Sequence, residues 1–406
     1  MTRRFYVTTP IYYVNGAPHI GHAYTSIAAD VMARFHRLAG HDVFFLTGTD
    51  EHGQKVEQAA QAAGVEPQAF VDRIAADFRD MADSMAISYD DFIRTTEPRH
   101  VTGAQALWER VAQNDAIYLG AYEGWYALRD ECFYGEDELT TGPDGQKLAP
   151  TGAPVEWVKE PSYFFRLSAF QDRLLELYEQ CPEFLGPHGA RNEIISFVRQ
   201  GLRDLSISRT SFKWGIPVPG DEAHVMYVWF DALANYLSAL GFPDMDGARA
   251  AYWPADLHLV GKDIARFHAV YWPAFLMAAG IDVPSRIFAN GWWTVEGQKM
   301  SKSIGNVIDP RDLVREFGLD AVRFFLLREV PFGGDSDLSR KALITRNNVE
   351  LANDLGNLAQ RTLSLVAKNC EAMILRGVSQ RLRISSFSHR WRCCPSLWPR
   401  NWNAVP

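Results

Sequence analysis

The first fifty residues carry a strand–helix–strand pattern, which most constrains the fold. Residues 5–13 are rich in aromatic and β-branched side chains, as expected of a buried strand. After a turn at residues 15–18, apolar residues recur at helical spacing from Ile20 to Leu38, and Gly40 closes the helix. A second apolar strand follows at residues 43–47. Strand, helix and strand in this order form a βαβ unit, which requires a parallel sheet.

The later part of the chain predicts a second half of the same sheet. Residues 118–213 differ in texture, with short aromatic strands and a Gly/Pro/Asp-rich stretch, and are typical of an inserted module. Strand-like runs return at residues 225–230, 257–260 and 286–295, with a helix around residues 264–278. Capping residues predict helices that begin at Asp309 and Asp320. The predicted fold class is α/β, a Rossmann-like doubly wound parallel sheet split by an inserted module.

Composition and termini exclude several classes of protein. The 406 residues suffice for two or three domains, and 47% hydrophobic content supports packed cores. A net charge of -8 argues against a general polyanion-binding surface, so any nucleic acid must meet local patches. We expect no secretory signal, because the first four residues lead directly into a strand-like segment, and the sequence holds no run of about 18 apolar residues. The five scattered cysteines predict a reduced, cytoplasmic protein without disulfides.

The strongest chemical signal is His19-Ile20-Gly21-His22, where the first strand passes into the first helix. A helix N-terminus presents unpaired N–H groups and a positive dipole, which suit a phosphate. Gly21 allows a nucleotide to approach the backbone closely, and the two imidazoles can donate hydrogen bonds to phosphate oxygens. The alternative is a pair of incidental surface histidines near a helix cap.

The second signal is Lys299-Met300-Ser301-Lys302-Ser303, which follows the predicted strand ending near Val295. Two lysines beside small hydroxyl residues, bracketed by glycines, form a movable cationic clamp for a triphosphate. A solvated basic loop is the alternative. Open α/β sheets bind ligands at the carboxyl ends of their strands, where two half-domains meet. The two signals together therefore predict one shared nucleotide site.

Both motifs resemble the signatures of class I aminoacyl-tRNA synthetases. Further blocks are similar to the methionyl-tRNA synthetase family in particular, and the resemblance covers residues 1 to about 372. These blocks are Thr8-Thr9-Pro10-Ile11-Tyr12-Tyr13-Val14-Asn15-Gly16, Gly48-Thr49-Asp50-Glu51-His52-Gly53, Tyr227-Val228-Trp229-Phe230-Asp231-Ala232 and Gly261-Lys262-Asp263-Ile264 with Phe267-His268. The resemblance implies activation of L-methionine by ATP to methionyl-adenylate and transfer to tRNA(Met), including the initiator tRNA.

The resemblance also implies a role for each matching residue. His19, His22, Lys299 and Lys302 are the expected catalytic residues. ATP is expected to contact Gly21, Gly261, Lys262, Asp263, Met300 and Ser301. Methionine is expected to contact Ile11, Tyr13, Asp50, Trp229, Leu233, Tyr236, Ile264 and His268, with Asp50 on the ammonium group. Core packing is the alternative for most apolar members of this set, whereas the polar tips of Tyr236 and His268 could address the thioether sulfur.

The final helix, residues 342–369, is expected to read the anticodon through Asn353, Asn357 and Arg361. Their spacing of four residues places them on one helix face, as recognition of unstacked bases requires. A solvated helix face is an equally weighted alternative. The expected cofactors are ATP and nucleotide-bound Mg²⁺, and we expect a monomer that does not bind membranes.

The resemblance divides the chain into six parts. The expected parts are a first Rossmann half (1–117), the connective module (118–213), a second Rossmann half (214–300), a signature-loop and stem-contact region (301–341), the start of a helical anticodon-binding domain (342–372) and an aberrant tail (373–406).

Two departures from the family pattern stand out. Many relatives carry paired zinc-binding cysteines in the module, whereas this chain offers only Cys132 there, so we expect no structural zinc. Residues 372–406 hold six arginines, no lysine and no acidic residue, and three tryptophans fall in the last sixteen residues. A disordered basic tail rarely uses tryptophan and cysteine so freely. Our hypothesis is out-of-frame translation that truncates the anticodon-binding region.

Other functions share parts of this pattern. Synthetases for leucine, isoleucine and valine share both signatures but usually carry a larger editing module, and the cysteine enzyme needs zinc-binding cysteines. A nucleotidylyltransferase also uses a His-x-Gly-His turn, but lacks the block around Trp229. A catalytically impaired tRNA-binding paralogue stays open because of the tail, although the intact signature residues argue against it.

Overall fold

The computed structural model describes residues 3–370 except 15, 131, 143–144 and 301–305. The aberrant tail predicted for residues 373–406 lies outside these described residues. The chain divides into two compact units, Met1–Asp337 and Leu338–Pro406. Each unit is described by itself below.

The core of the first unit is a seven-stranded sheet in which every recorded pairing is parallel. Its order is β10-β16-β15-β1-β3-β2, with β4 also paired to β3. The strands are β1 (Arg4–Thr8), β2 (Tyr12–Tyr13), β3 (Asp42–Asp50), β4 (Asp91–Arg94), β10 (Leu185–Gly186), β15 (Leu257–Gly261) and β16 (Ile287–Asn290). The predicted Rossmann-like α/β fold is confirmed.

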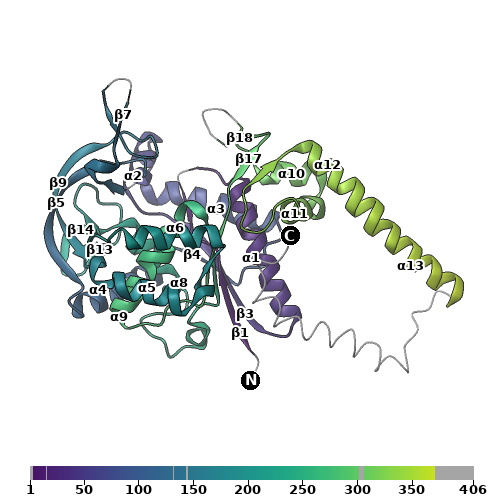
Figure 1. The fold of residues 1–406 in the computed structure, drawn as a ribbon, viewed down its shortest axis with the longest axis horizontal. Coiled ribbons are helices and arrows are strands. Elements are labelled where there is room, and N and C mark those ends of the chain that lie inside the picture. Colours follow the sequence, from purple (N-terminus) through teal and green to yellow (C-terminus); the bar gives the residue numbers. More distant parts are fainter. Residues whose placement is uncertain (1–2, 15, 131, 143–144, 301–305, 371–406) are drawn as a thin grey trace. The chain divides into compact units, whose positions relative to one another are not determined.

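Helices cover both faces of this sheet (Figure 1). The helix α1 (Ile20–Leu38) packs on β1 and β3, as the predicted βαβ unit requires. On the opposite face, Tyr6 of β1 and Phe44 of β3 share one large apolar core with α4 (Pro98–Gln113) and α9 (Trp272–Ala279). The remaining helices of at least six residues in this unit are α2 (Gln54–Ala62), α3 (Pro67–Ser84), α5 (Gln171–Gln180), α6 (His188–Arg199), α7 (Val228–Leu233), α10 (Pro310–Phe317) and α11 (Leu319–Arg328).

The stretch predicted as an inserted module has two structural parts. Its first part is an antiparallel sheet of order β11-β9-β5-β6, with a separate β7-β8 pair and a small core of Ala127, Ala149, Ala153 and Val155. The second part returns to the main sheet, because β10 pairs with β16 and α5 and α6 contribute to the large core. The strands are β5 (Ile117–Ala127), β6 (Cys132–Tyr134), β7 (Thr140–Thr141), β8 (Lys147–Leu148), β9 (Glu156–Phe165) and β11 (Leu205–Ser206).

One predicted strand is wrong in part. Residues 225–230 were expected to form a continuous strand, but β14 (Asp221–Met226) ends early and Val228 begins α7. Moreover, β14 belongs to a separate antiparallel sheet with β12 (Ser208–Arg209) and β13 (Pro217–Val218). A short, fully buried apolar run has no polar alternation, so its periodicity cannot distinguish a strand from a buried helix.

The predicted run at residues 286–295 is two strands rather than one. After β16, Gly291 allows a close approach of two backbone segments, since a Cβ there would lie 2.2 Å from the carbonyl oxygen of Gly334. The chain then enters a second sheet of order β18-β17-β19. These strands are β17 (Trp293–Val295), β18 (Gln298–Lys299) and β19 (Ser336–Leu338). The signature loop therefore begins at the end of this small sheet.

Short helical segments complete the described part of the first unit. They are η1 (Glu136–Glu138), η2 (Leu167–Phe170), η3 (Pro182–Phe184), α8 (Asn235–Ser238), η4 (Ala248–Tyr252), η5 (Lys262–Ile264) and the π-helical η6 (Phe267–Tyr271). The predicted helix around residues 264–278 is thus η5, η6 and α9 in succession. The predicted cap of α10 is present, because the Asp309 side chain accepts a hydrogen bond from the backbone N–H of Arg311 at 2.9 Å.

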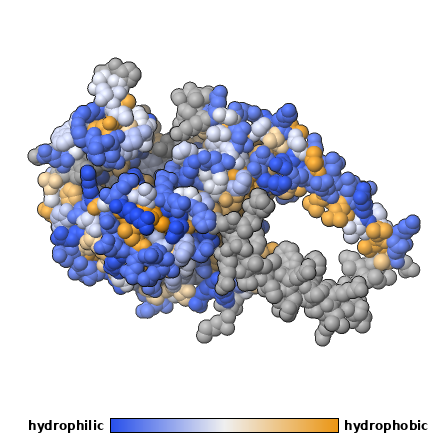
Figure 2. Space-filling model, in the orientation of Figure 1, coloured by the Kyte–Doolittle hydropathy of each residue, from blue (hydrophilic) through white to orange (hydrophobic). Residues whose placement is uncertain are grey.

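The described part of the second unit is a helical run of α12 (Arg340–Arg346), η7 (Asn347–Leu355), which is π-helical, and α13 (Gly356–Asn369). Several large apolar side chains on this run are more than half exposed, and Figure 2 shows hydrophobic patches along it. These residues are Leu355, Leu358, Leu363 and Leu365. Among the described residues, none of the helices combines the length and apolar character that crossing a membrane requires.

Gly48 of β3 gives a test of the central sheet. A Cβ at Gly48 would lie 2.0 Å from the carbonyl oxygen of Ile93 in the neighbouring strand β4. We expect Gly48→Ala to lower the free energy of unfolding by about 3 kcal/mol, because the strands must move apart. Urea unfolding followed by tryptophan fluorescence measures this change.

The matched control is Gly189→Ala. Gly189 lies in the first turn of α6, and nothing lies within 4 Å of the added Cβ. This variant should be neutral or slightly more stable, because alanine favours a helix over glycine. Equal destabilisation by the two variants would contradict the close approach of β3 and β4.

Candidate active site

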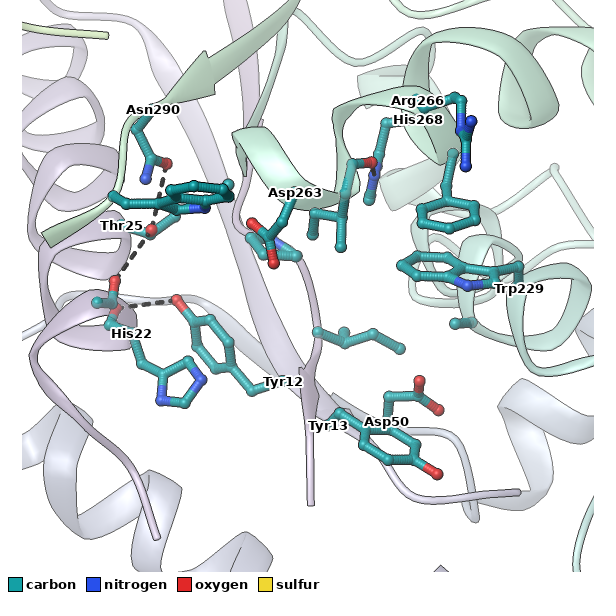
Figure 3. Close-up of a pocket in the computed structure, with 18 of the residues that line it drawn as sticks. Tyr12, Tyr13, His22, Thr25, Asp50, Trp229, Asp263, Arg266, His268 and Asn290 are labelled. Atoms are coloured by element: carbon teal, nitrogen blue, oxygen red, sulfur yellow. Dashed lines mark hydrogen bonds between the residues drawn. The ribbon is translucent and has the colours of Figure 1, made fainter. Parts of the chain in front are cut away.

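A cavity of about 1040 Å³ lies where the main strands end. Asp50, Gly261 and Asn290 are the last residues of β3, β15 and β16, and all three line the cavity. Parallel strands place their carboxyl ends at one edge of the sheet, which is where open α/β sheets bind ligands. Figure 3 shows the site as two ends, with His22 and Asn290 on one side, Trp229 and Asp50 on the other, and Asp263 between them.

Most of the residues predicted from the sequence line this single cavity. All eight residues expected to contact methionine are among them: Ile11, Tyr13, Asp50, Trp229, Leu233, Tyr236, Ile264 and His268. So are six residues expected at the nucleotide: His19, Gly21, His22, Gly261, Asp263 and Met300. The cavity thus joins residues from both ends of the first unit's sequence, although their individual roles stay predictions.

The histidine signature is built into the first turn of α1. His19 is the N-cap residue, and its Nδ1 accepts a hydrogen bond from the N–H of Gly21 at 3.1 Å. His22 Nδ1 accepts from the backbone N–H of His19 at 3.1 Å, and the two rings stack at 3.8 Å. Because each Nδ1 is an acceptor, the proton of each neutral ring lies on Nε2. Both imidazoles are therefore hydrogen-bond donors through Nε2.

The same helix end is connected to the region of the second signature. The backbone N–H of Ile20 donates to the carbonyl oxygen of Ile308 at 3.2 Å, and Met300 and Val307 line the cavity. Residues on both sides of the signature loop thus lie at the site. Ser301 and Lys302 are outside the described residues, and only the backbone of Lys299, in β18, is described.

The end of the cavity expected to hold methionine, which we call the methionine end, is lined mainly by aromatic and apolar side chains beside the Asp50 carboxylate. The rings of Trp229 and Phe267 stack in parallel with centroids 3.8 Å apart. His268 Nδ1 lies 3.0 Å from the carbonyl oxygen of Ile264, so Nδ1 carries the proton and donates. His268 Nε2 therefore accepts from the hydroxyl of Tyr236 at 2.7 Å.

Burial determines the protonation state of this pair. Desolvation lowers the pKa of His268 to about 4, with the hydrogen bond to Ile264 opposing the shift. Desolvation also raises the pKa of Tyr236. Both side chains are consequently neutral near pH 7, and they present polar tips without charge in an apolar pocket.

Comparison with known proteins decides the family. The family model described as "tRNA synthetases class I (M)" matches residues 5–363. The chain belongs to the class I methionyl-tRNA synthetases.

Curated relatives and solved structures agree with this family. The methionine–tRNA ligase of Rickettsia bellii is 61% identical over 374 residues, which cover 92% of this chain and 73% of the relative. The ligase of Brucella suis is 60% identical over 371 residues, or 91% and 72% of the two chains. The Mycobacterium tuberculosis methionyl-tRNA synthetase in complex with methionyl-adenylate has a TM-score of 0.88 and 57% identity, covering 91% of this chain and 73% of that one.

One residue that the methionyl-tRNA synthetase pattern assigns to ATP is paired with a carboxylate in this structure. Lys262 Nζ is 2.6 Å from both carboxylate oxygens of Asp335 and 3.9 Å from the ring centroid of Trp292. Its neighbours Gly261 and Asp263 line the cavity, whereas Lys262 is not among the described residues that do so. A phosphate must compete with Asp335 for this lysine, and the sequence could not predict that because Asp335 is 73 positions away.

Several lining residues were missed from the sequence. Asn290 accepts a hydrogen bond from the hydroxyl of Thr25 at 3.2 Å, which ties the end of β16 to α1 beside the histidine signature. The inserted module also reaches the cavity, through Asp130, Cys132, Tyr134 and Thr151. A position at the end of a predicted strand could have indicated Asn290. No sequence signal indicated that residues of the module line the cavity, because their partners there are far away in the chain.

The structure also bears on the metal sites of this synthetase family. Within residues 3–370, apart from the gaps given above, no group of three or more His, Cys, Asp or Glu side chains is arranged to hold a metal ion. Cys132 is partly buried, and desolvation raises the pKa of its thiol to about 11. The absence of a structural zinc stays a prediction.

The neutral state of His268 predicts a pH dependence of stability. The unfolded chain binds a proton at this residue as the pH falls below the ordinary value of 6.5, whereas the folded chain does not until about pH 4. Stability is therefore lost as the pH falls from 6.5 to 4, and at pH 5 the loss is about 2 kcal/mol. Urea unfolding at pH 7 and pH 5 should show a smaller loss for His268→Gln than for the unsubstituted protein.

The exposed His188 provides the control, because it lies on the surface of α6. His188→Gln should retain the pH dependence of the unsubstituted protein. If His268→Gln loses as much stability between pH 7 and pH 5 as the unsubstituted protein, His268 is not buried as a neutral ring.

Proposed function

We propose that this chain uses the cavity at the carboxyl edge of its sheet to activate L-methionine with ATP and to charge tRNA(Met). The observation that carries the proposal is the joining of two chemically different ends in one cavity. Imidazole donors at the N-terminus of α1 form one end, and a neutral aromatic pocket with the Asp50 carboxylate forms the other. The related M. tuberculosis synthetase was solved in complex with methionyl-adenylate, a molecule with matching ends.

The proposed chemistry is in-line displacement at phosphorus. The methionine carboxylate oxygen attacks the α-phosphorus of ATP, a new P–O bond forms, and pyrophosphate leaves with the electron pair of the broken bond. The reaction needs no acid–base side chain, so catalysis consists mainly of positioning and charge stabilisation. His19, His22, Lys299 and Lys302 would stabilise the negative charge that builds on the phosphate oxygens. A terminal hydroxyl of the tRNA then attacks the activated carbonyl, and AMP leaves.

Substrate binding divides between the two ends of the cavity. Asp50 would hold the ammonium group of methionine, while Trp229, Leu233 and Ile264 enclose its side chain and Ile11 and Tyr13 close the pocket. Asp263 is suited to the ribose hydroxyls, since it lies between the two ends (Figure 3). We propose that Mg²⁺ enters bound to the phosphates of ATP.

Selectivity needs more than apolar area. One methylene in an apolar pocket discriminates by only about 1–3 kcal/mol, so bulk alone cannot reject leucine or homocysteine. The stacked Trp229 and Phe267 rings leave a flat wall that suits an unbranched thioether, and branched side chains would contact it poorly. The neutral pair of Tyr236 and His268 adds polar atoms without the charge that would repel an apolar side chain.

The tRNA-binding part of the proposal rests on the second unit. Asn353, Asn357 and Arg361 are all exposed, on η7 and α13. Amide and guanidinium groups on an exposed helix suit the edges and faces of unstacked bases. We propose that they contact the anticodon and that the initiator tRNA is among the substrates.

We also propose that the protein acts in the cytoplasm, that it is a monomer, and that it holds no structural zinc.

Lys302→Ala tests the assignment of the second signature. We expect methionine binding to be nearly unchanged, whereas methionine-dependent ATP–pyrophosphate exchange should slow by about 100-fold, as for loss of one transition-state donor. Lys213→Ala removes an exposed lysine elsewhere and should keep the original exchange rate. Near-normal exchange by Lys302→Ala would remove Lys302 from the mechanism.

Arg361→Ala tests the proposed anticodon contact. Charging of tRNA(Met) at low tRNA concentration should fall by about tenfold, since one base contact is lost, and ATP–pyrophosphate exchange should not change. Lys368→Ala removes a positive charge from the same exposed helix and serves as the control. A similar loss of charging with both variants would indicate general electrostatic attraction instead of anticodon reading.

A further inference from the structure

A single buried carboxylate connects three segments behind the methionine end of the cavity. Asp231 of α7 is fully buried, and its two oxygens have different partners. Oδ2 lies 2.7 Å from Nδ1 of His52, which follows β3, and Oδ1 lies 2.8 Å from Nε2 of His100 in α4. Both histidines are themselves buried. We call this arrangement the His52–Asp231–His100 bridge.

A second contact connects α4 to α8. His100 Nδ1 lies 2.9 Å from the hydroxyl oxygen of Ser238, so one imidazole connects α4 to both α7 and α8. One turn along α4, a Cβ at Gly103 would lie only 2.6 Å from the Cβ of Ser238. The helix α4 therefore approaches α8 as closely as a glycine allows. The position of α7 and α8 is set from this side of the molecule.

The residues that face methionine alternate with the residues of the bridge. Asp50 is two residues before His52, and Trp229 and Leu233 are two residues on either side of Asp231. Tyr236 likewise stands two residues before Ser238. Asp50, Trp229, Leu233 and Tyr236 line the cavity, whereas the three bridge residues are not among the described residues that line it. Any movement of the bridge would therefore shift the Asp50 carboxylate relative to Trp229, Leu233 and Tyr236.

The buried Asp231 carboxylate needs a hydrogen-bond partner on each of its oxygens, because it is ionised. Burial alone would raise the pKa of Asp231, but nearby His52 and the hydrogen bonds from His100 and His52 outweigh it and lower the pKa to about 2. Asp231 is therefore ionised while buried. A buried charge that loses one partner keeps its desolvation cost without compensation. Glu51, next to His52, is also buried, but it is paired with Arg94 at 2.7 Å and is satisfied separately.

We propose that Asp231 is a positioning residue for methionine, and that the His52–Asp231–His100 bridge fixes the distance between the Asp50 carboxylate and the wall formed by Trp229, Leu233 and Tyr236. The inference rests on the proposed function, because it assigns these four residues to one substrate. It predicts an effect confined to methionine. The nucleotide end is attached to α1, β15 and β16, which the bridge does not touch.

Asp231→Asn is the direct test. The amide nitrogen of asparagine cannot accept a hydrogen bond, so one of the two histidines loses its partner while the volume is unchanged. Methionine binding, measured by isothermal titration calorimetry without ATP, should weaken by about tenfold or more, as for a buried group left unpaired. In ATP–pyrophosphate exchange, KM for methionine should rise by a similar factor, and KM for ATP should change by less than about twofold.

Asp30→Asn is the matched control, because Asp30 is another fully buried carboxylate with partners on both oxygens. It accepts hydrogen bonds from Ser88 and Arg34, away from the cavity. Thermal unfolding of both variants shows their loss of stability, and Asp30→Asn should leave methionine binding unchanged. Equal weakening of methionine binding by the two variants would overturn the proposal, as would unaltered binding by folded Asp231→Asn.

His100 provides a second test if Asp231→Asn does not fold. His100→Gln keeps an N–H that can donate to Asp231, whereas His100→Leu keeps the volume and removes the hydrogen bonds. KM for methionine should rise more in the leucine variant than in the glutamine variant. Equal KM values for methionine would overturn the positioning role. If the unsubstituted protein shows no methionine-dependent exchange, the proposed function itself fails, which is a distinct result.

Discussion

The parallel pairing of β1 with both β3 and β15 is the constraint on which the site depends. This one central strand joins the two halves of the sheet, because Val7 lies opposite both Phe45 of β3 and Leu257 of β15, which are 212 positions apart in sequence (257 − 45). Parallel pairing brings the carboxyl ends of these strands to one edge, so residues from both halves converge there. The histidine signature is placed by the same geometry, because α1 begins beyond β1. Without this pairing, no local motif could assemble a common cavity.

Sequence patterns predicted the features that depend on local interactions. The βαβ unit is visible because a buried parallel strand is continuously apolar and its helix repeats every three to four residues. The signature histidines and the residues expected to contact methionine were predicted from blocks that resemble one family, and the structure brings those described residues into one cavity. Residues 225–230 were predicted as one strand, but the aromatic and β-branched residues from Val228 onward begin α7, because a short apolar run alone does not distinguish a strand from a helix.

The features that sequence patterns did not predict depend on partners far away in the chain. Asp335 holds Lys262 across 73 positions, and Asp231 meets His52 and His100 across 179 and 131 positions. Nothing local to a lysine or an aspartate indicates such a partner, because the same residues are usually solvated on a surface. The contribution of β10 to the main sheet is similar, since a two-residue strand has too few positions to show any periodicity.

The two ends of the cavity use imidazole in opposite ways, and their surroundings explain why. At the nucleotide end, backbone N–H groups of the first helical turn donate to Nδ1 of His19 and His22, which leaves the ring proton on Nε2. At the methionine end, Nδ1–H of His268 donates to the carbonyl oxygen of Ile264, so Nε2 is left as an acceptor for the hydroxyl of Tyr236. Charge accumulates on phosphate oxygens but not on a thioether, so donors suit one end and a neutral, internally satisfied pair suits the other. The backbone groups around each ring, which belong to the fold, thus decide the chemistry that each histidine can perform.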